Sequence, residues 1–197
     1  MMNHIDLAKA FRKLGVESLN DMQKATAKAM QAGKGDVVVL SPTGTGKTLA
    51  YLLPLAEMIN PDNDNVQAVV IVPGRELALQ SQQVLAALGA VRGMACYGGR
   101  AAMEEHRALK QLRPQVVFAT PGRLNDHLAK GNISANDVRL LVIDEFDKCL
   151  DMGFENEMRT ALASLSYVQR RVLLSATNSP RIPLFVENAK LECIDFV

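Results

Sequence analysis

The chain has 197 residues, of which 48% are hydrophobic and 22% charged, and its 22 Lys and Arg residues nearly balance its 21 Asp and Glu residues. This composition excludes an intrinsically disordered chain, and the length suffices for one domain with a substantial core. It also excludes a polybasic nucleic-acid-binding tail, so any contact with nucleic acid must come from individually placed groups.

Short β-branched apolar runs alternate along the chain with longer segments whose apolar residues recur at helical spacing. The runs are continuous, which is typical of strands covered on both faces. The predicted strands are Val37–Leu40, Ala68–Val72, Gly93–Tyr97, Val116–Thr120, Leu140–Asp144, Val172–Ser175 and Cys193–Val197. The predicted helical segments are one containing Leu7, Phe11 and Leu14, then Leu49–Ile59, Glu76–Leu88, Ala101–Leu112, Leu124–Leu128, Glu155–Leu165 and Pro183–Lys190. This alternation predicts an α/β fold with a mostly parallel sheet between two layers of helices.

The first predicted strand leads into a glycine-rich loop, Ser41-Pro42-Thr43-Gly44-Thr45-Gly46-Lys47-Thr48, that opens the next helix. Glycines let successive backbone N–H groups point at phosphate oxygens, and the helix N-terminus favours anions. Lys47 supplies a charge for the β- and γ-phosphates, and the Thr48 hydroxyl suits Mg²⁺. Ser41 stands where the common pattern has Gly, and a plain strand-to-helix turn is the alternative. We expect the loop to bind the phosphates of ATP.

An acidic sequence, Asp144-Glu145-Phe146-Asp147, follows the buried strand that starts at Leu140. Acids at the end of a buried strand are costly unless they bind a cation or are well paired. In a nucleoside triphosphatase, Asp144 would hold Mg²⁺ through its water shell and Glu145 would orient the attacking water. The alternative is a helix N-terminus rich in acids. Because a phosphate loop precedes them, we interpret Lys47, Asp144 and Glu145 as candidate catalytic residues, and Thr48 and Asp144 as the Mg²⁺ site.

Three strand ends carry glycines that open a helix: Pro73-Gly74, Gly98-Gly99 and Pro121-Gly122. Such turns expose backbone N–H groups that grip phosphates without reading bases. Arg75 and Arg123 are expected to add charge-assisted bonds to the same nucleic-acid backbone. Tight turns without a ligand are the alternative.

These features occur in the order found in the DEAD-box RNA helicase family, and nearly the whole chain resembles the first RecA-like domain of that family. Residues 43–48 resemble motif I, and the acidic sequence resembles the Asp-Glu-Ala-Asp of the family. The other similarities are Gly15 and Gln23 to the Q motif, Pro73-Gly74-Arg75-Glu76-Leu77-Ala78 to motif Ia, Gly98-Gly99 to the glycine doublet, Thr120-Pro121-Gly122-Arg123 to motif Ib, and Ser175-Ala176-Thr177 to the motif after the next strand.

The resemblance implies ATP and Mg²⁺ as cofactors, with Gln23 at the adenine and residues 43–48 at the phosphates. It implies RNA, as single strand or duplex, bound through its backbone by Pro73, Gly74, Arg75, Gly98, Gly99, Thr120, Pro121, Gly122 and Arg123. The strand ending at Ser175 is expected between the phosphate-loop strand and the Asp144 strand. The hydroxyls of Ser175 and Thr177 would then bond to Asp147 and couple the γ-phosphate site to RNA.

Family enzymes need a second RecA-like domain that supplies arginine fingers. Residues 1–197 are therefore expected to be one ATP-binding domain of a longer, monomeric helicase, nearly inactive when isolated. Two other functions stay open: a DNA-acting translocase of the same superfamily, and a nucleotide-dependent clamp on RNA or protein that does not unwind.

The chain departs from the family at several positions. Gly74 replaces the usual Thr, Leu19-Asn20 replaces Pro-Thr inside the Q motif, and Phe146 replaces Ala. We expect Phe146 to pack into the core, and we expect the same of Phe11 on the apolar face of its helix.

The histidines His4, His106 and His127 have no carboxylate or cysteine at ligand spacing and are expected at the surface. The three cysteines, Cys96, Cys149 and Cys193, are too scattered for a disulfide framework or a zinc site and are expected to be buried or half-buried. No apolar run approaches the length of a membrane span, and the start does not resemble a signal peptide. We therefore expect a soluble cytoplasmic protein without membrane contact.

Overall fold

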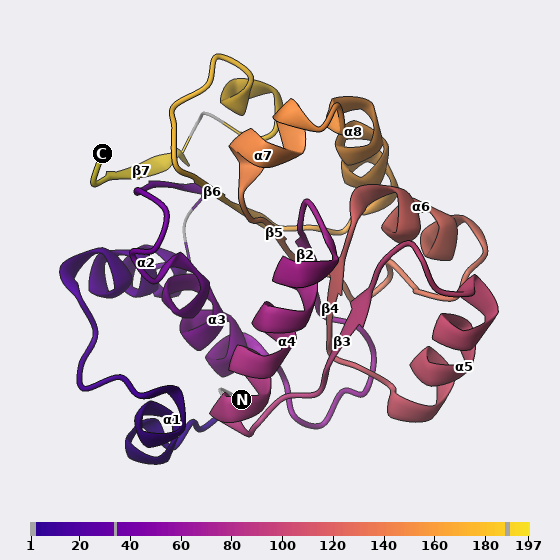
Figure 1. Ribbon diagram of the computed structural model, residues 1–197, viewed down its shortest axis with the longest axis horizontal. Helices are drawn as coiled ribbons and strands as arrows, with labels where there is room; N and C mark the ends of the chain where they lie inside the picture. Colours follow the sequence, from indigo (N-terminus) through magenta and orange to yellow (C-terminus); the bar gives the residue numbers. More distant parts are fainter. Residues whose placement is uncertain (1–2, 34, 188–189) are drawn as a thin grey trace.

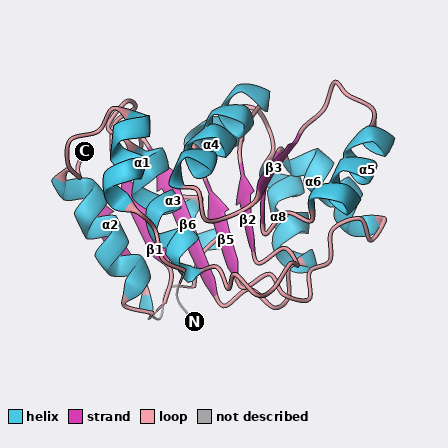
Figure 2. Ribbon diagram, turned by 90° about the horizontal axis from the view of Figure 1, so that it is seen from below, coloured by secondary structure: helices cyan, strands magenta, loops and turns pink. Residues whose placement is uncertain are grey.

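The computed structural model describes residues 3–33, 35–187 and 190–197. Within these residues a single sheet of seven strands has the order β3-β4-β2-β5-β6-β1-β7, and every strand pair is parallel. Figure 2 shows β1, β6, β5, β2 and β3 in a row. The strands are β1 (Val37–Leu40), β2 (Ala68–Ile71), β3 (Gly93–Cys96), β4 (Val116–Ala119), β5 (Leu140–Ile143), β6 (Arg170–Ser175) and β7 (Glu192–Asp195).

Helices cover both faces of this sheet, as the alternation of elements predicts. One face packs against the first four helices and the other against the last four (Figure 1). The helices are α1 (Leu7–Leu14), α2 (Asp21–Gln31), α3 (Lys47–Met58), α4 (Arg75–Leu88), α5 (Ala102–Leu112), α6 (Pro121–Ala129), α7 (Phe146–Asp151) and α8 (Glu155–Ser164). None of them, within the described part of the chain, is both long and apolar enough to cross a membrane.

Strand residues alternate between the two layers. In β1, Val37 and Val39 face the first layer, and Val38 and Leu40 face the second. All four are buried. Burial on both faces explains why the strands are continuous apolar runs, and all seven predicted strands are confirmed with ends within about two residues.

The predicted helix Pro183–Lys190 is wrong over most of its length. In the described residues of this segment the structure has the 3₁₀ turn η1 (Ile182–Leu184), and residues 185–187 are not helical. The reason is that Phe185 and Val186 are both buried, and the N–H of Glu187 donates to Asp36 Oδ2 at 2.7 Å instead of to a helical carbonyl. Residues 188 and 189 lie outside the described part of the chain.

The sheet order brings the predicted site residues to one edge. The carboxyl ends of parallel strands meet at the same edge of a sheet, which is where α/β proteins bind ligands. The strand β6 lies between β1 and β5, as expected, so the turn after Ser175 separates the glycine-rich loop from the acidic sequence. The strands β3, β4 and β2 are consecutive, so their three glycine-containing turns form a second group.

Candidate functional site

The glycine-rich loop between β1 and α3 needs two glycines for its backbone. Gly44 and Gly46 have φ angles of 81° and 84°, in the left-handed region that favours glycine. A Cβ atom on Gly46 would lie 2.5 Å from Gln23 Nε2, whereas one on Gly44 would meet no atom within 4 Å. The conformation of Gly46 therefore favours glycine, and a side chain at this position would displace the amide of Gln23.

Lys47 is the first residue of α3, and its side chain folds back into the loop. Its Nζ donates to the carbonyl of Pro42 at 2.9 Å and also to that of Ser41. Burial lowers the pKa of Lys47, while the charge of Asp144, followed by those of Asp147 and Glu145, acts to raise it. The ammonium thus lies at a helix N-terminus and near three carboxylates, an arrangement suited to a phosphate and a cation side by side.

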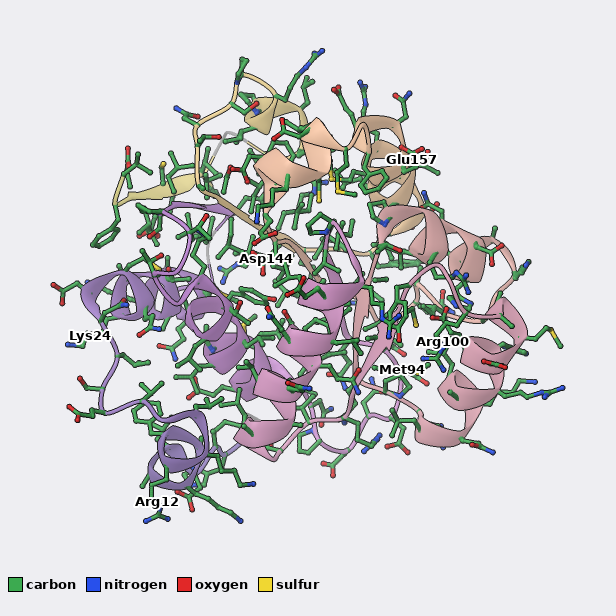
Figure 3. All side chains as sticks on the ribbon, viewed as in Figure 1. Arg12, Lys24, Met94, Arg100, Asp144 and Glu157 are labelled. Carbon is green, nitrogen blue, oxygen red and sulfur yellow. The ribbon has the colours of Figure 1, made fainter. Side chains whose placement is uncertain are left out.

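Asp144 is buried directly after β5, and Figure 3 shows it near the middle of the molecule. Its Oδ1 accepts the N–H of Glu145 at 2.8 Å, whereas its Oδ2 is buried without a hydrogen-bond partner. Burial, with a further contribution from Glu145, raises the pKa of Asp144 to about 6. The buried hydroxyl of Tyr51 lies near this carboxylate without reaching hydrogen-bond geometry. A buried carboxylate oxygen without a partner fits a hard cation.

Glu145 has a left-handed backbone, with φ 48° and ψ 51°. This conformation costs a residue other than glycine about 1–2 kcal/mol, and such strain is concentrated at functional sites. The turn at Glu145 lets α7 begin at Phe146, two residues after Asp144. The Glu145 carboxylate accepts from Lys148 Nζ at 3.1 Å, and both residues border a cavity of about 370 Å³ between α4 and α7. Pro73 and Gly74 line the same cavity, so it connects the acidic sequence with one of the glycine-containing turns.

Phe146 is fully buried, as expected. Its ring packs edge-on against Phe185, with centroids 5.1 Å apart and an interplanar angle of 68°. The expected hydrogen bond from Ser175 to Asp147 is not formed. The Ser175 hydroxyl instead donates to the carbonyl of Thr177 at 2.7 Å, because a serine at a buried strand end reaches its own turn first.

Gln23 connects α2 to the glycine-rich loop. Its Nε2 donates to the carbonyl of Gly46 at 3.1 Å, and its Oε1 accepts the N–H of Asn20 at 2.9 Å. Asn20 accepts the N–H of Gln23 in return, which completes a capping box, and its Nδ2 donates to the carbonyl of Thr45 at 2.9 Å. Asn20 is not among the site residues predicted from the sequence, although the Asn-x-x-Gln spacing is the signature of this cap.

The turns after β2, β3 and β4 form the second group of predicted residues. Helices α4 and α6 begin at Arg75 and Pro121, directly after their turns, and α5 begins just beyond Gly98-Gly99. Both glycines of the doublet, and Gly122 as well, are exposed. Three helix N-termini therefore face one side, each with unpaired backbone N–H groups that suit phosphates.

Arg123 turns inward rather than toward this exposed side. Its side chain is 15% exposed, and its Nη1 donates to Glu105 Oε1 at 3.1 Å. Its Nη2 donates to the carbonyl of Arg100 at 3.0 Å. Arg75, in contrast, is exposed, and its guanidinium lies over the ring of Tyr97, 5.4 Å from the centroid. Of the two arginines predicted to contact a nucleic-acid backbone, only Arg75 lies at the surface of these turns.

The expectation that His127 lies at the surface is wrong. His127 is fully buried and pairs with Glu105 at 2.8 Å, because it lies one helical turn after Arg123 on the inner face of α6. Cys96 is buried beside them, whereas Cys193, expected to be at least half-buried, is exposed. Cys149 is buried as expected, His4 is exposed, and His106 is half-buried.

Cys96, Glu105 and His127 place one potential metal-ligand atom each within 4.8 Å of one another. Burial and the charge of Glu105 raise the pKa of Cys96 to about 12, which favours the thiol in the metal-free protein. Both oxygens of Glu105 already accept hydrogen bonds. The cluster is therefore a hydrogen-bond network and not a metal centre.

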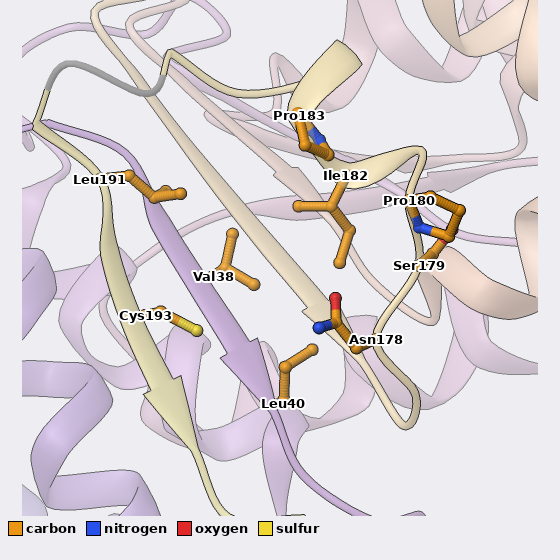
Figure 4. Close-up of a pocket in the computed structure, with 9 residues that line it drawn as sticks. All are labelled: Val38, Leu40, Asn178, Ser179, Pro180, Ile182, Pro183, Leu191 and Cys193. Carbon is orange, nitrogen blue, oxygen red and sulfur yellow. The ribbon is translucent and has the colours of Figure 1, made fainter.

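An apolar groove of about 540 Å³ lies over β1 and β7, under the segment 178–183 (Figure 4). Val38, Leu40 and Cys193 form its floor, and Ile182 and Leu191 are among its walls. It contains none of the predicted site residues.

Comparisons with known proteins agree on one family. The sequence model described as "DEAD/DEAH box helicase" matches residues 20–183. The chain is 37% identical over 190 residues to the DEAD-box ATP-dependent RNA helicase CshA of Bacillus subtilis, covering 95% of this chain and 38% of that protein. It is 38% identical over 179 residues to the ATP-dependent RNA helicase CshA of Limosilactobacillus reuteri, covering 89% of this chain and 36% of that protein. The chain thus spans little more than a third of the length of these relatives.

Solved structures give the same result for the fold. A DEAD box protein from the hyperthermophile Methanococcus jannaschii superposes with a TM-score of 0.88 at 27% identity, over 99% of this chain and 56% of that one. A hypothetical ATP-dependent RNA helicase from Sulfolobus tokodaii superposes with a TM-score of 0.84 at 31% identity, over 95% of this chain and 56% of that one. The predicted α/β fold and the resemblance on which the function was predicted are both confirmed.

Proposed function

The chain belongs to the DEAD/DEAH box helicase family, and on that premise we propose that it is the RecA-like, ATP-binding domain of an ATP-dependent RNA helicase. The proposed reaction is hydrolysis of ATP to ADP and phosphate, coupled in a longer protein to local separation of RNA strands. The observation that carries the proposal is that Lys47, at the start of α3, and the buried Asp144, directly after β5, lie at the same carboxyl edge of the sheet, where the charge of Asp144 acts to raise the pKa of Lys47.

The residues of the phosphate loop have separate tasks in this proposal. Backbone N–H groups of residues 43–48 cradle the phosphates, and Lys47 exchanges its loop carbonyls for the β- and γ-phosphate oxygens. Gln23 contacts the adenine from the helix that it caps. Because it also holds the Gly46 carbonyl, occupancy of the adenine site is linked to the shape of the loop.

The donor set at the strand end fits Mg²⁺, since Asp144 offers a buried carboxylate oxygen without a partner and Thr48 a nearby hydroxyl on α3. When bound, Mg²⁺ would neutralise charge on the phosphates. Glu145 accepts a hydrogen bond from the attacking water and orients it, while its Oε1 accepts from Lys148. Asp147, whose charge lies near Lys47, is proposed to link the γ-phosphate site to RNA without the hydrogen bond from Ser175, which donates to the carbonyl of Thr177 instead.

RNA is the proposed partner of the second group of turns. Pro73, Gly74 and Arg75 would contact its backbone, as would Gly98, Gly99, Thr120, Pro121 and Gly122. Contact through backbone N–H groups suits a chain whose charges nearly cancel, because it needs no basic field. A second RecA-like domain would complete the RNA groove and supply arginine fingers, and the working protein is proposed to be a monomer. The three free cysteines support a cytoplasmic location.

The direct test is Lys47→Ala, assayed by calorimetric titration with ADP and Mg²⁺. We expect binding to fall below detection while the fold stays intact, because the side chain bonds only to loop carbonyls. Lys130→Ala, which removes an exposed lysine from the end of α6, is the matched control and should bind ADP like the parent chain. Unchanged ADP affinity in a folded Lys47→Ala chain would overturn the assignment of the phosphate loop.

A further inference from the structure

A single buried carboxylate connects the loops that are proposed to face RNA. Glu105, on α5, is fully buried. Its Oε2 accepts the backbone N–H of Tyr97 at 2.8 Å, and Tyr97 directly precedes the glycine doublet. Its Oε1 accepts from Arg123 at 3.1 Å and pairs with His127 Nε2 at 2.8 Å, both on α6. Glu105 thus joins the turn after β3 to the helix that opens after β4.

The ion pair of Glu105 and Arg123 holds both ends of the glycine doublet. Glu105 binds the N–H that precedes Gly98-Gly99, and Arg123 binds the Arg100 carbonyl that follows them. The doublet has no side chain of its own with which to fix its backbone, and Gly99 has a φ of 90°. The direction of its backbone groups therefore depends on these two bonds, because glycine is otherwise free to adopt several conformations.

Tyr97 extends the connection to the third turn. The guanidinium groups of Arg75 and Arg100 lie 5.4 Å and 5.7 Å from the centroid of its ring. Arg75 begins α4 after the Pro73-Gly74 turn. A shift of Tyr97 would therefore move the surface formed by the turns after β2 and β3 together.

His127 completes the set of donors to Glu105. The amide nitrogen of Asn132 lies 3.0 Å from His127 Nδ1, so that ring nitrogen accepts a hydrogen bond. The proton of the neutral ring is then on Nε2, from which it is donated to Glu105. Three donors thus converge on one carboxylate, and its charge is balanced by the guanidinium of Arg123. A buried ion pair contributes little net stability, and the best-supported reason to retain one is that it specifies a single arrangement.

We propose that Glu105 is a positioning residue for RNA binding, which holds the glycine doublet and the start of α6 in the arrangement that RNA requires, and that Arg123 acts through this carboxylate and not on a phosphate. The inference rests on the proposed RNA-binding function of the three turns. The proposal assigns different roles in RNA binding to the two arginines: Arg123 positions the doublet through Glu105, whereas Arg75 is exposed on the same surface and can contact RNA directly.

The test compares Glu105→Gln with Glu104→Gln, its exposed neighbour on α5. Both changes remove one negative charge from the same helix, so general electrostatics would strengthen RNA binding equally in both. We expect Glu105→Gln instead to weaken binding of a fluorescent single-stranded oligouridylate about tenfold, the scale of one lost charge-assisted hydrogen bond. Glu104→Gln should bind as tightly as the parent chain or more tightly. Equal or tighter binding by a folded Glu105→Gln chain would overturn the proposal.

Arg123→Lys supplies a second, independent comparison. Lysine keeps the positive charge but cannot bond to Glu105 and the Arg100 carbonyl in the geometry of the guanidinium fork. If Arg123 acts through Glu105, this variant loses RNA affinity to a similar extent as Glu105→Gln. If Arg123 contacts a phosphate directly, the lysine retains most of the affinity, and that outcome would overturn its assigned role. ADP affinity is expected to stay at the parent value in all three variants.

A readout without RNA distinguishes failure of this inference from failure of the proposed function. Amide hydrogen exchange at Gly98, Gly99 and Arg100 should accelerate in Glu105→Gln and stay at the parent rate in Glu104→Gln, while exchange in the central strands is unchanged. If the parent chain binds RNA too weakly to measure without the second RecA-like domain that would complete the groove, hydrogen exchange still tests the positioning of the doublet. If exchange at the doublet is the same in both variants, Glu105 does not position it.

Discussion

The buried carboxylate of Asp144 lowers the stability of the folded chain by an amount that depends on pH. Its pKa in the folded protein is about 6, above its ordinary value of about 3.9, because burial disfavours the charged form. Between these two values the folded chain binds more protons than the unfolded chain, so stability falls as the pH rises from about 4 to 6. The loss of stability is complete above about pH 6 and absent below about pH 4.

Asp144→Asn should therefore make the free chain more stable at pH 7.5, by about 1–3 kcal/mol for a shift of this size. Urea unfolding without nucleotide or Mg²⁺ measures the difference, which should shrink at pH 4.5. ADP affinity in the presence of Mg²⁺ should fall in the same variant. The exposed Asp62→Asn serves as control. A stability difference that is the same at both pH values would contradict the buried charge.

The residues that the sequence identifies are those in local patterns. Lys47 and Asp144 each lie in a short segment whose sequence alone predicts its chemistry. Glu105 and His127 were not identified, because 22 residues separate them and their pairing depends on the packing of α5 against α6. Nothing in the spacing of the motif that contains Arg123 indicates that its guanidinium points inward.

At the level of elements, two glycines at the junction of α2, the phosphate loop and α3 allow a controlled comparison, because they share a backbone conformation and differ in their contact with α2. Gly44 and Gly46 have nearly the same positive φ, so alanine should cost each about 1–2 kcal/mol of backbone strain. Only at Gly46 would the new Cβ lie 2.5 Å from Gln23 Nε2. We therefore expect Gly46→Ala to lower ADP affinity and stability more than Gly44→Ala does.

Adding Gln23→Ala to each variant isolates this contact. It should recover part of the lost stability of Gly46→Ala, because the clash disappears, and none of that of Gly44→Ala. Thermal unfolding of the four variants and the parent chain gives the comparison. If Gln23→Ala has the same effect in both glycine backgrounds, the junction is not held by the contact between Gln23 and the loop.

The elements differ in how far the sequence predicts them. Strands of a parallel sheet are buried on both faces, and their apolar runs are visible without any knowledge of their neighbours. The segment after Pro183 has the apolar content of a helix, but Asp36, distant in the sequence, binds its backbone and turns Phe185 and Val186 into the core. The helix α2 was not predicted either, because Gln23 and Thr26 interrupt the apolar side chains that it buries in the core.

At the scale of the whole molecule, the proposed ATP and RNA sites share one edge of the sheet. The 370 Å³ cavity between α4 and α7 has Gly74 on one side and Glu145 on the other, so the two sites are separated by little more than this cavity. Glu145, the proposed water-orienting residue, pairs with Lys148 through Oε1 at 3.1 Å, and both residues border this cavity.

The proposed catalytic residues have no arginine partner in the described part of the chain. Within the described residues, the hydrogen-bond and ion-pair partners of Lys47, Asp144 and Glu145 include no arginine. An arginine finger is typically worth about 10³–10⁵ in the rate of phosphoryl transfer. The 197-residue chain should therefore bind ADP but release phosphate from ATP barely faster than Lys47→Ala, and single-stranded RNA should not increase that rate. Phosphate release measured with and without RNA, with Lys47→Ala as the blank, gives the comparison. RNA-stimulated turnover that Lys47→Ala abolishes would show that these residues already form a complete catalytic site.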